Sequence, residues 1–124
     1  MLLLEETLAN RDGAGPVIQI SSERGKLLIL TLGITRMVER DSVLISIWGS
    51  PDGRDWGLTP LVSFTPKYYC GFYSAVLNLA SRPEVGHLRV LWHVQRWKGA
   101  QEDDSECGFY VSVEASGSRL GAVA

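Results

Sequence analysis

The sequence predicts an all-β fold, an antiparallel β-sandwich of jelly-roll type with about seven or eight strands. Short runs of apolar or alternating residues recur along the chain, and clusters of Pro, Gly, Asp and Ser separate them at near-even spacing. No segment of useful length shows the period of a helix. The length of 124 residues and the hydrophobic content of 45% fit one domain over residues 1–124 with a substantial core.

Apolar runs between the turns give the expected strands. Residues 1–10 form either one weak turn or an extra edge strand. The remaining strands are expected at 17–20, 26–35, 43–50, 58–64, 71–79, 88–96 and 108–115. The segments between them are expected to be turns and loops, and the small residues of 116–124 a flexible tail.

Alternation along these strands predicts which side chains point into the core. Side chains two residues apart share a face of a strand. The expected inward residues are Leu28, Leu30, Leu32, Ile34, Val43, Ile45, Ile47, Leu88, Val90, Trp92, Val94, Phe109, Val111 and Val113. The apolar residues of 71–79 leave the register of that strand open.

The strands at 26–35 and 43–50 carry apolar residues on both faces. On the second face these residues are Leu27, Ile29, Leu44 and Trp48. A lone sandwich needs to bury only one face of each sheet. The additional apolar residues therefore predict contacts with another chain.

A turn follows the strand at 43–50. Pro51 presets φ, Asp52 accepts hydrogen bonds from nearby backbone amides, and Gly53 tolerates a positive φ. Asp52 and Asp55 supply only two carboxylates, whereas a calcium loop needs several oxygen ligands at fixed spacing. The segment is therefore interpreted as a turn, with Trp56 covering the end of the hairpin.

Other potential metal ligands do not form a recognisable site. The acidic run Glu102–Asp104, with Glu106, is interpreted as a solvated charge run rather than a cation site. A zinc site needs three or four ligands in register, and His87 and His93 are the only histidines. We expect both histidines to be exposed on strands, and we expect no metal and no cofactor.

Composition and motifs exclude several classes of function. The net charge of −2 and the scattered basic residues do not indicate a nucleic-acid partner. No nucleophile motif or phosphate-binding loop indicates an enzyme. No apolar run approaches the roughly 18 residues that membrane insertion requires. The first residues lack the features of a secretory signal, so we expect the protein in the cytoplasm or in a particle assembled there. Cys70 and Cys107 are expected to be two buried thiols that pack as small apolar residues; the alternative is one disulfide between them if the protein meets an oxidising compartment.

One segment resembles known β-sandwich families. The segment VLISIWGSPDGRDW at 43–56 is a strand followed by Ser-x-Asp-Gly-x-x-Trp. It resembles a hairpin of discoidin-like (galactose-binding-like) domains and one of phage-tail and virion-associated β-domains. The segments at 87–90 and 109–114 are similar to the closing strand pair of the discoidin-like group. The resemblance covers part of the chain and implies a β-sandwich; it assigns no ligand-binding residue here.

Aromatic residues gather in the loops expected at one end of the sandwich. In an antiparallel fold successive connections alternate between the two ends, so loops 36–42, 65–70 and 97–107 share one end. The candidate ligand-binding residues there are Arg40, Tyr68, Tyr69 and Trp97. Aromatic faces beside charged groups suit sugar stacking or a protein partner. The alternative is that these aromatics cap the core or lie in a subunit interface.

These observations favour a non-catalytic structural or assembly module that self-associates, such as a component of a phage-like or virion-like particle. Its expected partner is a second copy of the chain or another protein. The alternative function is a carbohydrate-binding module that uses the aromatic loops at one end of the sandwich.

Overall fold

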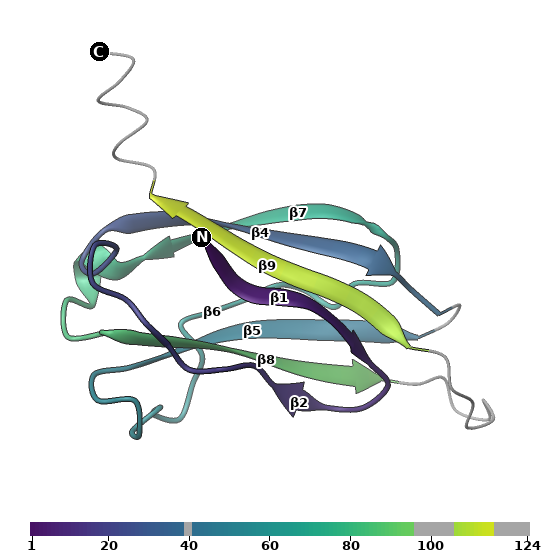
Figure 1. Ribbon diagram of the computed structural model, residues 1–124, viewed down its shortest axis with the longest axis horizontal. Helices are drawn as coiled ribbons and strands as arrows, with labels where there is room; N and C mark the ends of the chain where they lie inside the picture. The colour runs from purple at the N-terminus through teal and green to yellow at the C-terminus, as the bar shows by residue number, and fades with distance from the viewer. Residues whose placement is uncertain (39–40, 96–105, 116–124) are drawn as a thin grey trace, which may run out of the picture.

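Two antiparallel sheets pack against each other in the computed structural model, which describes residues 1–38, 41–95 and 106–115 (Figure 1). Sheet A has the strand order β1 (Leu2–Ala9), β9 (Cys107–Ala115), β4 (Leu27–Arg36), β7 (Gly71–Asn78). Sheet B has the order β2 (Gly13–Ala14), β8 (His87–Gln95), β5 (Ser42–Ser50), β6 (Val62–Ser63), with β3 (Ile18–Gln19) also paired to β8. The predicted antiparallel β-sandwich is confirmed, and the jelly-roll type stays a prediction.

The strands pair in a nested order. β1 pairs with β9, β2 and β3 pair with β8, β4 pairs with β7, and β5 pairs with β6. The pairings β4–β9 and β5–β8 join these pairs into the two sheets. The chain therefore crosses between the sheets at most of its connections, and strands distant in sequence become neighbours.

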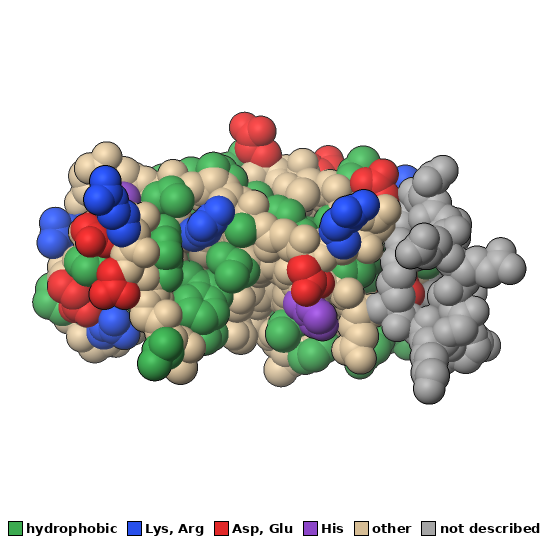
Figure 2. Space-filling view, turned by 90° about the horizontal axis from the view of Figure 1, so that it is seen from below, with side chains coloured by type: hydrophobic (Ala, Val, Ile, Leu, Met, Phe, Trp, Pro, Cys, Tyr) green, Lys and Arg blue, Asp and Glu red, His purple; other side chains and the backbone are tan. Residues whose placement is uncertain are grey.

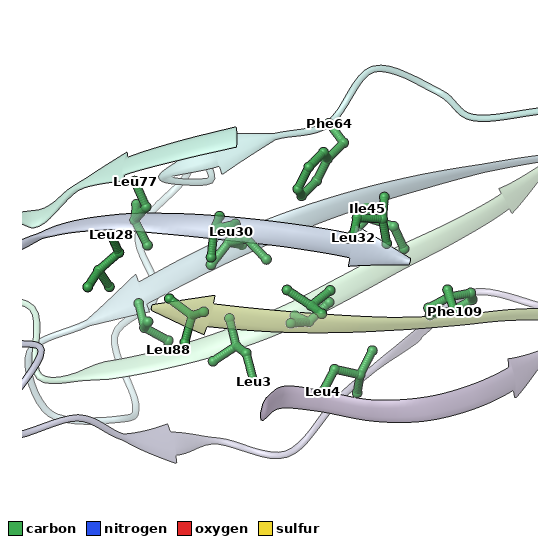
Figure 3. Close-up of a cluster of buried hydrophobic side chains, with 14 of the residues drawn as sticks. Leu3, Leu4, Leu28, Leu30, Leu32, Ile45, Phe64, Leu77, Leu88 and Phe109 are labelled. Atoms are coloured by element: carbon green, nitrogen blue, oxygen red, sulfur yellow. The ribbon is translucent and has the colours of Figure 1, made fainter. Parts of the chain in front are cut away.

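The core lies between the sheets and confirms the predicted inward faces. The buried cluster in Figure 3 contains side chains from both sheets, among them Leu28, Leu30, Leu32, Ile45 and Leu88. All residues predicted to point inward are buried except Trp92, which is half-buried. The Trp92 ring packs edge to face on Phe109, with the ring centroids 5.4 Å apart. Alternation therefore predicted the interior correctly on the four long central strands.

The prediction of a strand at 58–64 is wrong over most of that segment, because only Val62 and Ser63 form β6. Gly57 has a φ of +71°, which redirects the chain just before this segment. Pro60 has no amide hydrogen to give to a ladder. Leu58 is 96% exposed as a result.

For residues 1–10 the sequence predicted either a weak turn or an edge strand, and the structure has the edge strand. β1 pairs antiparallel with β9, and its register shifts between Leu2 and Leu4 and again between Leu4 and Thr7. Leu3 and Leu4 are both buried although they are consecutive, as a bulged strand allows. The two-residue strand β2 was not expected from the sequence.

The structure settles the register of β7, which the sequence left open. The outward residues are Phe72, Ser74, Val76 and Asn78, and the inward ones are Tyr73, Ala75 and Leu77. A single 3-10 turn, η1 (Leu79–Ser81), follows β7. No helix in the described residues has the length and apolar composition needed to cross a bilayer. The tail predicted at 116–124 lies outside the described residues.

Candidate interaction surface

Strand β7 forms one edge of sheet A. It pairs with β4 without a register shift from Leu27↔Asn78 to Ile34↔Gly71. In the described part of the chain, β7 pairs with no strand other than β4. Its second side therefore presents backbone donors and acceptors that no ladder uses.

The outer face of β7 is apolar and exposed. Phe72 is 77% exposed and Val76 is 59% exposed. Val76 lies opposite the half-buried Ile29 of β4, and Phe72 lies opposite Gly33. The sequence of β7, GFYSAVLN, contains no charged residue. Exposed aromatic and β-branched side chains on one uncharged strand are typical of a contact surface.

The apolar face continues from β7 onto the neighbouring strands. A Cβ added at Gly33 would overlap the ring of Tyr110 on β9, so glycine at this position lets that ring lie across the sheet. Tyr110 lies opposite Gly33 on the side away from Phe72. We name this area the β7 surface, which consists of Leu27, Ile29, Phe72, Val76 and Tyr110.

Two of the predicted ligand-binding residues lie in the loop that precedes β7. Tyr69 is 77% exposed and Tyr68 is 54% exposed, immediately before β7. The Tyr73 hydroxyl donates a hydrogen bond to the Tyr69 carbonyl oxygen over 2.9 Å. The Lys67 ammonium lies 4.2 Å from the centre of the Tyr73 ring. These contacts hold the loop against the start of β7. The other two candidates, Arg40 and Trp97, lie outside the described residues.

The strand ends that bound the predicted loop cluster lie at one end of the sandwich. The pairings Ile34↔Gly71, Ser42↔Gln95 and Arg36↔Gly108 bring them together, as the antiparallel prediction required. The connection between β1 and β2 reaches the same end, where Asp12 Oδ2 lies 2.7 Å from His93 Nδ1. The hydrogen bond with His93 lowers the pKa of Asp12. His93 is exposed, as predicted, whereas His87 is half-buried.

A shallow cavity of about 340 Å³ lies at the opposite end, between the β5–β6 connection and the residues after η1. Trp56 and Leu58 line it on one side, and Arg82 and Glu84 line it on the other. Arg82 Nε lies 2.7 Å from Glu84 Oε2, and this hydrogen bond lowers the pKa of Glu84. Sequence reasoning expected Trp56 to cover the hairpin end but did not predict the cavity, because its two walls come from separate loops.

The Asp52 segment is the turn that its sequence predicts. The amides of Arg54 and Asp55 donate to Asp52 Oδ1 over 2.8 and 2.9 Å, and the Ser50 hydroxyl donates to the same oxygen. These hydrogen bonds lower the pKa of Asp52 to about 2. Gly53 has a φ of +80°. The Asp52 carboxylate thus accepts its hydrogen bonds from groups of its own turn.

The two cysteines differ from each other. Cys107 is buried, with its Sγ 3.6 Å from Met37 Sδ, as predicted. Cys70 is exposed, so the prediction of a buried thiol there is wrong. It directly precedes β7, an edge strand of sheet A. Within the described residues, no three His, Cys, Asp or Glu side chains are grouped closely enough to hold a metal ion.

The outer face of sheet B differs from the β7 surface. Its large apolar side chains, Leu44, Trp48 and Leu91, are half-buried rather than exposed. Trp48 Nε1 donates to Ser46 Oγ over 3.0 Å. Figure 2 shows this side with hydrophobic side chains near the middle and basic and acidic ones beside them. The more exposed apolar side chains therefore lie on sheet A.

We found no protein-family model, curated protein or solved structure that matches this chain. The resemblance to discoidin-like and virion-associated domains therefore stays a prediction.

Proposed function

We propose that this protein is a non-catalytic structural module that self-associates through the β7 surface. The observation that carries the proposal is the exposure of Phe72 and Val76 on an edge strand that has no charged residue. Fully burying a side chain of this kind contributes about 1.5–3 kcal/mol. A symmetric contact buries each residue twice, once from each copy.

The test is the mass of the native particle, measured by light scattering over a range of protein concentrations. We expect a discrete oligomer at micromolar concentration. The double variant Phe72→Ser, Val76→Thr should be monomeric, because it removes the two exposed apolar side chains of β7 and introduces no charge. The matched control is Leu8→Ser on β1, where Leu8 is 51% exposed. A wild-type protein that stays monomeric at all concentrations would contradict the proposal.

A second function, carbohydrate binding, is supported by the exposure of the adjacent side chains Tyr68 and Tyr69. Aromatic faces stack on the apolar faces of sugar rings, and loops at sandwich ends commonly carry recognition residues. In this proposal Arg40 and Trp97 also contribute to the binding site. A glycan array should show hits that the variants Tyr69→Ala and Trp97→Ala lose. An array without hits would remove this function.

We also infer that the sandwich is of jelly-roll type. Its support is the nested order in which the first strand pairs with the last and the inner strands pair in turn. Jelly rolls occur in capsid and lectin domains. This class suits both a particle component and a carbohydrate binder, so the exposed side chains rather than the fold favour self-association.

The same proposal places the protein in the cytoplasm or in a particle assembled there. The exposed thiol of Cys70 supports a reducing compartment, since exposed thiols tend to oxidise elsewhere.

A further inference from the structure

We propose that two copies of the chain join edge to edge, with β7 of one copy antiparallel to β7 of the other about a two-fold axis at Ser74. The inference rests on the proposed self-association and specifies its geometry. Sheet A has four strands, so the pair would form one continuous sheet of twice that number. A second copy suits this edge because β7 carries no charge that would repel its own copy, and because its two exposed apolar residues, Phe72 and Val76, lie at equal distances in sequence from Ser74.

The four sheet edges formed by the described residues support this choice. Natural proteins protect exposed edges with charges, bulges, prolines or very short strands. β1 carries Glu5 and Glu6 and two register shifts, whereas β2, β3 and β6 have two residues each. β7 has eight residues, no charge and no register shift. Among the described edges, β7 alone lacks these protections.

The register follows from the geometry of antiparallel pairing. A two-fold axis perpendicular to the sheet keeps each side chain on its own face, so the axis must pass beside a residue and not between two. An axis at Ser74 places Phe72 opposite Val76 of the partner subunit, and Val76 opposite the partner subunit's Phe72. Aromatic and β-branched side chains directly opposite each other stabilise sheets. This register therefore covers both exposed apolar residues of β7.

The lack of charge makes β7 compatible with itself. The residues that would meet around the axis, Phe72, Ser74 and Val76, include no pair of like charges. The same operation on β1 would bring together the exposed glutamates Glu5 and Glu6 of two copies. Like charges directly opposite each other destabilise a sheet.

Disulfide trapping tests the geometry. Residues directly opposite in an antiparallel pair have Cα atoms about 4.5–5.5 Å apart, within the range that a disulfide spans. In a Cys70→Ser background, Ser74→Cys should form a covalent dimer on mild oxidation. Thr31→Cys is the matched control, because Thr31 lies beside Ser74 on the same outer face. Its two copies would be three strand spacings apart, about 14 Å, and should stay unlinked.

A charge-pair experiment gives an independent readout. Ser74 is exposed, so charged side chains at this position should not prevent folding. Ser74→Glu and Ser74→Lys should each be monomeric alone, because like charges meet at the axis. Mixing the two variants in equal amounts should restore the dimer mass.

The outcomes separate this inference from the function on which it rests. Dimers that link at Ser74→Cys and not at Thr31→Cys, and that return on mixing the charge variants, support β7 pairing. A stable oligomer that links poorly at Ser74→Cys, or equally at both positions, overturns β7 pairing and leaves self-association intact. A wild-type monomer at all concentrations overturns both.

Discussion

The two edge strands of sheet A, β1 and β7, solve the same folding problem in different ways. Each completes one side of the sheet and buries one face against sheet B. β1 carries Glu5 and Glu6 and shifts register twice along its pairing with β9. Glu6 also accepts a hydrogen bond of 2.8 Å from the Thr35 hydroxyl. β7 pairs in unbroken register and presents Phe72 and Val76 to solvent.

Of these two edge strands, β1 has features that protect an edge from pairing and β7 has none. Bulges and charges cost ladder hydrogen bonds and packing, and β1 contains both. Folding alone does not require β7 to omit them, because a charged side chain at Ser74 or Val76 would point to solvent in a monomer. The proposed partner would cover this flat, uncharged and apolar edge.

The largest expected effect comes from placing a charge on the unprotected edge. Phe72→Lys removes an aromatic contact from both subunits and adds two cations, so the dimer should dissociate at least about a hundredfold more readily, or about 2.8 kcal/mol. Leu8→Lys makes the same change at an exposed residue of β1 and should leave the dimer unchanged. Sedimentation equilibrium measures the dissociation constant of each variant. Equal effects of the two substitutions would contradict the proposed difference between β1 and β7.

A smaller effect is expected from a substitution on the outer face of sheet A, between its edge strands β1 and β7. Gly33→Ala would put a methyl group into the space of the Tyr110 ring, and overpacking of this kind costs about 1–3 kcal/mol of unfolding free energy. Denaturant unfolding measures this cost. Most of the loss should disappear when Gly33→Ala is introduced into a Tyr110→Ala protein, since the obstructing ring is then gone. An equal loss in both backgrounds would contradict the packing described for this face.

Removing the charges of β1 should have a modest effect. The double variant Glu5→Thr, Glu6→Thr takes away like-charge repulsion but keeps the bulges, so this edge should gain only weak pairing, worth about 1 kcal/mol. Light scattering at high protein concentration should show species larger than the dimer. Adding Ser74→Lys should remove the dimer and leave the weak species. No change in mass at any concentration would mean that the glutamates do not protect this edge.

The smallest expected effect is on the turn that contains Asp52, which belongs to neither edge strand of sheet A. The lowered pKa of Asp52, about 2, means that its ionised form stabilises the fold above about pH 4 and that this stabilisation is lost as pH falls toward 2. Asp52→Asn keeps an acceptor oxygen and does not titrate. Thermal unfolding of this variant should change less between pH 4 and pH 2 than that of the wild type. The side chain is exposed, so the difference should be small; identical pH profiles would contradict the assigned turn.

The sequence was sufficient to predict which residues form the core, but not which strands lie at the edges of the sheets. The burial of the strands around Leu30, Ile45 and Val111 was predicted because one face of each is apolar at every position, whereas the other face is only partly apolar. β7 has apolar residues on both faces, so its register could not be predicted. Which strand lies at an edge depends on pairings between distant segments, such as β1 with β9. These pairings belong to the tertiary structure, and the pattern within a single segment does not reveal them.

The candidate site was predicted only in part. Tyr68 and Tyr69 were correctly expected at a loop, but their position next to an edge strand became visible only with the strand order of sheet A. The exposed thiol of Cys70 was missed because composition alone does not distinguish an edge from the core. The cavity beside Trp56 was missed because its opposite wall, at Arg82, comes from another loop.

Hydrogen exchange of backbone amides at two protein concentrations tests the central claim most directly. At a concentration where the dimer dominates, amides of β7 that point away from β4 should exchange much more slowly than in the dilute monomer. Amides of β1 should exchange at the same rate in both samples. Concentration-independent exchange along β7, or new protection confined to β1, would contradict the claim that β7 is the edge built for a partner.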